Sequence, residues 1–131
     1  MAILNYCRQP LCIAFLSFFG FILWIIYAAD SGANNVFLRI VDLVPYGDKV
    51  AHVLLYGCLA LLLNLLLKRK VLIVKSINFQ LGSLLVLGFA ALEELSQGFF
   101  ATRNLDAWDL FADVLGVYLA ALLVTCKKGA H

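Results

Sequence analysis

The chain has 131 residues, which is one domain's worth by length. Only 14% of its residues are charged, 64% are hydrophobic, and the mean hydropathy is +0.97. Soluble globular domains carry about 25% charged residues, so this composition excludes an ordinary water-soluble domain. The formal net charge is only +2. We expect one integral membrane domain over residues 1–131, with the lipid bilayer as its partner and no nucleic acid.

Four apolar segments follow one another along the chain. They are Leu11 to Ala29, Val50 to Leu67, Ile77 to Gly98, and Asp106 to Thr125. A helix needs about 20 residues to cross a bilayer, so the pattern predicts an all-α fold, a polytopic bundle of four transmembrane helices. A cleaved signal peptide is the competing interpretation of the first segment. Tyr27 would occupy the −3 position of a cut after Ala29 and fits poorly there, which favours a retained helix.

The loop between the first two segments has a helical pattern of its own. Apolar residues recur near helical spacing at the positions Val36, Phe37, Ile40, Val41 and Val44. Such a pattern predicts a short helix that lies on the membrane or over a site.

Positive charge is distributed unevenly between alternate loops. Seven cations fall in the amino terminus, the second loop and the tail, namely Arg8, Lys68, Arg69, Lys70, Lys75, Lys127 and Lys128. The other two loops hold only Arg39, Lys49 and Arg103. The positive-inside rule then predicts that both termini are cytoplasmic.

Polar side chains gather where this topology brings segment ends to the outer face. The candidate ligand-binding residues are Asp48, Lys49, His52, Glu94, Gln97, Arg103, Asp106, Asp109 and Asp113, with Glu93 beside them. The last three aspartates follow an i, i+3, i+7 pattern that places them on one helix stripe. Ionisable groups inside a membrane are costly and are functional candidates by default.

A stripe of small residues runs near these aspartates. Ala112, Gly116 and Ala120 recur every four residues. Small residues at this spacing allow helix backbones to approach closely in lipid, so we expect compact packing of the bundle.

Three interpretations of the polar cluster remain open from the residues alone. The carboxylates outnumber the cations, so either some are protonated, or a cation joins them, or several face water. His52 with Glu93 or Glu94 and Asp109 would suit zinc or manganese, a divalent metal cofactor. Alternatively, Arg103, Lys49 and protonated His52 receive a phosphate or carboxylate headgroup. The third interpretation is a structural network between helices.

The ordered polar residues resemble those of a known family. Asp48-Lys49-x-x-His52, Glu94-x-x-Gln97, then Arg103, Asp109 and Gly116 are similar to the pattern of the VanZ-like membrane proteins, over residues 45–125. The resemblance implies a small multi-helix protein of the bacterial cytoplasmic membrane. The founding member of the family is linked to resistance to the antibiotic teicoplanin. Asp113 departs from the pattern, since many members have Asn there, and Glu93 is an additional acid.

The sequence therefore supports three functions that compete. The first is a cell-envelope protein that binds a lipid, such as a lipid-linked precursor, at an outward-facing site. The second is an intramembrane metal-dependent hydrolase or transferase, with Glu94, Glu93 and His52 as candidate catalytic residues. The third is an accessory subunit that binds a membrane-protein partner or a second copy of itself.

Overall fold

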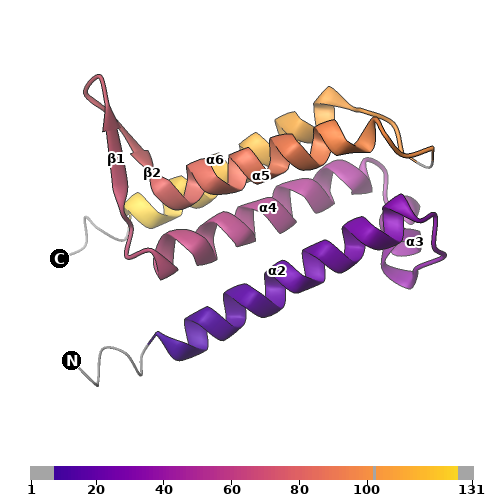
Figure 1. The fold of residues 1–131 in the computed structure, drawn as a ribbon, viewed down its shortest axis with the longest axis horizontal. Helices are drawn as coiled ribbons and strands as arrows, with labels where there is room; N and C mark the ends of the chain where they lie inside the picture. The colour runs from indigo at the N-terminus through magenta and orange to yellow at the C-terminus, as the bar shows by residue number, and fades with distance from the viewer. Residues whose placement is uncertain (1–7, 102, 127–131) are drawn as a thin grey trace.

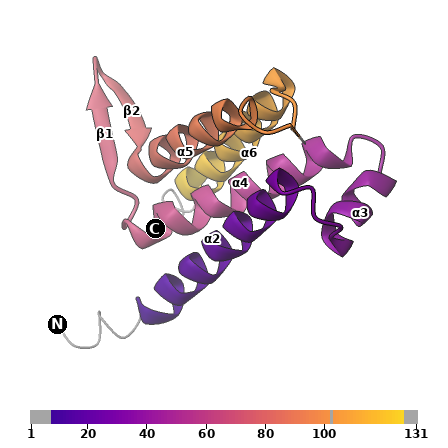
Figure 2. The ribbon, with the colours of Figure 1, turned by 45° about the vertical axis from the view of Figure 1, so that its right-hand side comes forward.

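The structure is a bundle of apolar helices with a small hairpin at one end. This computed structural model describes residues 8–101 and 103–126. Within them lie α2 (Gln9–Asp30), α3 (Val36–Leu43), α4 (Gly47–Leu66), β1 (Val71–Val74), β2 (Ile77–Gln80), α5 (Leu81–Gln97) and α6 (Ala107–Cys126) (Figure 1). The long helices run side by side, and the hairpin stands at the end where α4 stops and α5 begins (Figures 1 and 2). The prediction of a helical membrane bundle is confirmed in this coarse form.

The prediction of four spanning helices is wrong. Three helices of the described chain, α2, α4 and α6, are long and apolar enough to cross a membrane. The expected third span divides instead, because Ile77–Gln80 pairs with Val71–Val74 in an antiparallel hairpin. The remaining helix, α5, has 17 residues, or about 25 Å at helical rise, which is shorter than the roughly 30 Å hydrocarbon core.

The hairpin was missed because an apolar run alone does not separate strand from helix. The decisive signal is the turn between the strands. Lys75 and Ser76 both have positive φ, 49° and 69°, as the two central residues of a type I′ hairpin turn do. The orientation of the two termini stays a prediction, and Lys127 and Lys128 lie outside the described residues.

The short helix expected in the first loop is present as α3. Its start is capped by Asn35, whose side chain accepts a hydrogen bond of 2.8 Å from the backbone N–H of Phe37. The ring of Phe37 then packs edge-on against Phe21 of α2, with 5.7 Å between the ring centroids. This contact ties α3 to the end of the bundle at which α4 begins.

The helices α4 and α6 form the closest pair in the bundle. A Cβ atom at Gly57 would lie 3.0 Å from the carbonyl oxygen of Gly116, and one at Gly116 would overlap the carbonyl oxygen of Val53. Ala112 and Ala120 of the predicted small-residue stripe are also buried. The absence of side-chain atoms at these positions therefore sets how near the two backbones can approach.

A polar contact fixes α5 against the other end of α4. The fully buried Asn64 donates to the Ser83 hydroxyl at 2.8 Å and accepts from the backbone N–H of Ser83 at 3.2 Å. Between this contact and the polar site lies an apolar core of residues from α2, α4, α5 and α6, namely Ile22, Tyr56, Leu59, Ala60, Val86, Ala90, Val117 and Ala120.

Replacing Gly116 by Ala should weaken the bundle, because its new methyl group has no room against Val53. Overpacking of this kind costs about 1–3 kcal/mol. The midpoint of thermal unfolding in detergent should therefore fall by several degrees. Gly88→Ala in α5 is the matched control, because a Cβ there meets no atom within 4 Å. An equal loss in both variants would contradict the close α4–α6 approach.

Candidate functional site

The predicted polar residues do converge at one end of the bundle. Residues from α4, α5, α6 and the segment before α6 meet there, although more than 50 positions separate some of them in the chain. They form three connected groups, one around Lys49, one around His52 and one around Glu93.

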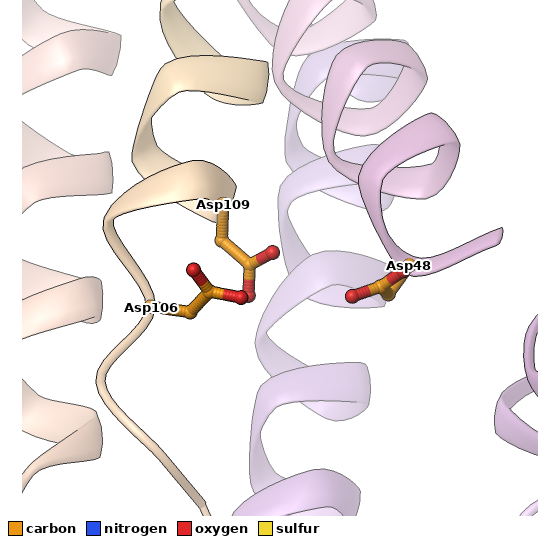
Figure 3. A group of neighbouring side chains, drawn as sticks. All are labelled: Asp48, Asp106 and Asp109. Carbon is orange, nitrogen blue, oxygen red and sulfur yellow. The ribbon is translucent and has the colours of Figure 1, made fainter. Parts of the chain in front are cut away.

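The ammonium group of Lys49 lies at the centre of the first group. Its Nζ atom is 2.7 Å from Asp48 Oδ2, 2.8 Å from Asp106 Oδ2 and 2.5 Å from Asp109 Oδ1. The three carboxylates come from the start of α4, the segment before α6 and the first turn of α6, and they point toward the space between these elements (Figure 3). One cation thus joins the amino-terminal ends of α4 and α6.

Asp106 also has a structural role that helical spacing did not reveal. It precedes α6, and its Oδ1 accepts from the backbone N–H of Trp108 at 2.9 Å, which caps the helix. Its own backbone N–H donates to Glu94 Oε1 at 2.6 Å. The hydrogen bonds from Lys49 and Trp108 lower the pKa of Asp106. Its stabilising contribution is therefore present at neutral pH and is lost as the pH falls through that lowered value.

His52 and Asp113 form the second group. His52 Nδ1 lies 2.7 Å from Asp113 Oδ1, and its Nε2 lies 3.7 Å from Asp109 Oδ2. Asp113 is fully buried, and its Oδ2 atom has no hydrogen-bond partner among the described residues. With Asp113 ionised, Nδ1 of the imidazole donates to it and Nε2 is left available for a proton or a ligand.

Glu93 connects the third group. It accepts from the Gln97 amide at 2.8 Å and from the Tyr56 hydroxyl at 3.4 Å. The guanidinium of Arg103 lies 3.5 Å from Glu93 and 3.5 Å from Asp30 at the end of α2. Charge-assisted hydrogen bonds are usually about 2.7–2.9 Å long, so Arg103 is held more loosely than Lys49.

A cavity of about 280 Å³ opens beside these groups. Its polar lining includes His52, Glu93, Arg103 and Asp109. Its apolar lining comes largely from α2 and α3, with contributions from α4, and includes Ile22, Ile25, Ile26, Ala29, Phe37, Leu38, Val41, Ala51 and Leu55. Asp42 and Asp48, both exposed, line it too. Of the predicted site residues, Lys49, Glu94, Gln97, Asp106 and Asp113 do not line the cavity.

Two members of the site were not predicted from the sequence. Tyr56 lies one helical turn after His52 and its ring stacks on the imidazole, with centroids 5.8 Å apart, so i, i+4 spacing could have found it. Asp30 is the last residue of α2 and lies at the end of the bundle where α4 begins. A charged residue at the end of the first apolar segment was the sign in the sequence that could have identified it.

The carboxylate cluster does not have the geometry of a resident metal centre. Asp48, Asp106 and Asp109 each offer an oxygen within 4.8 Å of the others. The ammonium of Lys49 already lies within 2.8 Å of each of these carboxylates, so a divalent ion would have to displace it. In the predicted set of His52, Glu94 and Asp109, Glu94 binds the Asp106 backbone and does not line the cavity. With Glu93 in place of Glu94 all three residues line the cavity, but among the described residues only Asp48, Asp106 and Asp109 bring three such ligand atoms within 4.8 Å of one another. None of these sets fits zinc or manganese as it stands.

No protein-family model, curated protein or solved structure matches this chain. The resemblance to the VanZ-like proteins therefore rests on the residues alone.

Replacing Lys49 by Met should destabilise the protein, because three carboxylates lose their shared cation. The Lys49 side chain is 26% exposed, so we expect a loss of about 1–3 kcal/mol, between the values for surface and buried pairs. Adding Asp109→Asn to this variant should recover much of the lost stability, because Asp109 is the most buried of the three partners and its charge would otherwise be left unpaired. Thermal unfolding in detergent measures both effects.

Asp48→Asn is the matched control for the Lys49 variants, because the Asp48 side chain is 56% exposed and its loss should change the unfolding midpoint little. An unaltered midpoint in Lys49→Met would contradict the role of the ammonium.

Proposed function

We propose that this chain is a VanZ-like protein of the bacterial cytoplasmic membrane that binds an amphiphilic ligand with a phosphate or carboxylate headgroup. The site faces the outer side, and a lipid-linked precursor of the cell envelope is the kind of ligand that it would take. A role in glycopeptide resistance would be one consequence of such binding. The observation that carries the proposal is the cavity, which places Arg103 beside an apolar wall.

The charges around the cavity support a role for Arg103 in recognition. Lys49 contacts three carboxylates at 2.8 Å or less, whereas the ion pairs of Arg103 with described residues are two contacts of 3.5 Å. A guanidinium carries five N–H donors in a planar fork that matches phosphate and carboxylate. An anionic headgroup can therefore approach Arg103 more closely than its present partners do.

The size and place of the cavity support an amphiphile. Ligand pockets usually have about 300–1,000 Å³, so 280 Å³ holds a headgroup and the adjoining part of a lipid but not a whole lipid. The wall formed by Ile22, Ile25 and Phe37 would contact the first apolar atoms. Because the cavity lies at an end of α2 and α4, two of the candidate spans, the rest of the chain can remain in the bilayer.

Arg103→Ala should reduce binding of a polyprenyl phosphate by roughly ten- to a hundredfold, the value of a hydrogen bond to a charged group. Native mass spectrometry of the purified protein with added polyprenyl phosphate measures the bound fraction. The polyprenyl alcohol, which lacks the phosphate, should bind weakly to both proteins. Arg39→Ala is the matched control, because Arg39 is an exposed arginine of α3 that does not line the cavity. Equal binding of phosphate and alcohol would refute the proposal.

A catalytic role is the second candidate, and the pairing of His52 with Asp113 favours it. A buried carboxylate that orients an imidazole is a common arrangement for a general base. Nε2 of His52 is the nitrogen nearer to Asp109, and both residues line the cavity. Glu93, held by Gln97 and Tyr56, is the second acid on that lining.

The two candidates differ in what His52→Gln would do. A hydrolase or transferase would lose turnover of a polyprenyl diphosphate by a hundredfold or more, the usual contribution of a general base, and would still bind polyprenyl phosphate. A binding protein would show no turnover before or after the change. Release of inorganic phosphate, measured with the reconstituted protein, separates these outcomes.

A further inference from the structure

The β1–β2 hairpin exposes apolar side chains on a part of the molecule that no helix covers. Each of its apolar residues is 39–70% exposed, namely Val71, Leu72, Ile73, Val74, Ile77 and Phe79. The hairpin crosses the direction of the long helices at one end of the bundle in both views (Figures 1 and 2). If the helices run through a bilayer, the hairpin extends along the membrane plane at its boundary.

The hairpin is a defined element rather than a frayed loop. Four residue pairs join its strands, from Val71 with Gln80 to Val74 with Ile77. The backbone N–H of Leu81 donates to the Lys70 carbonyl at 2.9 Å and closes its base. An isolated two-stranded hairpin is marginally stable in water, and a surface that covers its apolar side chains would stabilise it.

Four cations flank β1, three before the strand and one in the turn after it, without acids among the described residues to pair with them. Lys68, Arg69 and Lys70 precede β1, and Lys75 lies in the turn. None of the four forms an ion pair with any residue that the structure describes. The eight acidic residues all lie toward the other end of the helices, namely Asp30, Asp42, Asp48, Glu93, Glu94, Asp106, Asp109 and Asp113.

We propose that the hairpin is an interfacial anchor for anionic phospholipids, on the membrane face opposite the polar site. Its apolar side chains enter the boundary between headgroups and acyl chains, and its four flanking cations pair with lipid phosphates. Two copies of the chain paired through the open strand edges are the other conceivable partner. Anionic lipid is favoured because the cations of two copies would repel each other, whereas a negative surface attracts all four.

The test places an environment-sensitive fluorophore on the exposed strand, at Ile73→Cys, in the full chain. The native cysteines are first replaced by serine, at Cys7, Cys12, Cys58 and Cys126. The labelled protein is reconstituted, one copy per disc, into lipid nanodiscs of phosphatidylcholine with or without phosphatidylglycerol. With phosphatidylglycerol, the emission should shift to the blue, brominated lipids should quench it, and added salt should weaken both effects.

Changing the four flanking cations to Gln should return the emission to its value in phosphatidylcholine alone. Arg39→Gln is the control, because this exposed cation lies in α3 at the other end of the molecule, and it should have no effect. Aqueous emission in every lipid, or a shift that ignores lipid charge and salt, would overturn the proposal. A shift seen only in discs that hold two copies would overturn it in favour of strand pairing.

Discussion

The contact of one lysine with three carboxylates is the constraint on which the polar end of the molecule depends. Lys49 holds the start of α4 against the start of α6 through Asp106 and Asp109. Asp109 is the most buried of the three partners, so its charge depends most on the ammonium group. Further along the same two helices, Gly57 and Gly116 allow the backbones of α4 and α6 to approach closely. Between these glycines and Lys49, His52 of α4 contacts Asp113 of α6. Lys49 does not line the cavity itself, but its contacts hold Asp109 and the start of α4, which do.

The two cations of the site differ in how strongly they are held. Lys49 has short contacts to three acids, and Arg103 has long contacts to two. The two side chains carry the same charge, but of the two Arg103 lines the cavity and Lys49 does not. A division follows from this difference. Lys49 holds the ends of α4 and α6 together, and in the proposed function Arg103 supplies donors to the ligand.

The two ends of the helical bundle carry opposite charges. One end holds the eight acidic side chains, four of which line the cavity, and the other has an exposed apolar hairpin whose cations form no ion pair with any described residue. The apolar core and the contact of Asn64 with Ser83 separate the two ends. Each end therefore offers a different surface chemistry.

The sequence by itself determined the membrane class, the approximate limits of α2, α4 and α6, the presence of α3 and the residues of the polar site other than Asp30 and Tyr56. These features are local, because hydropathy and helical spacing are read from neighbouring positions. Only the tertiary structure decided that residues 77–80 form a strand and that α2 and α3 supply the apolar wall. It also decided that Asp30 joins the site and that Lys49 is held by short contacts while Arg103 has longer ones. These depend on contacts between distant segments, which no local pattern encodes.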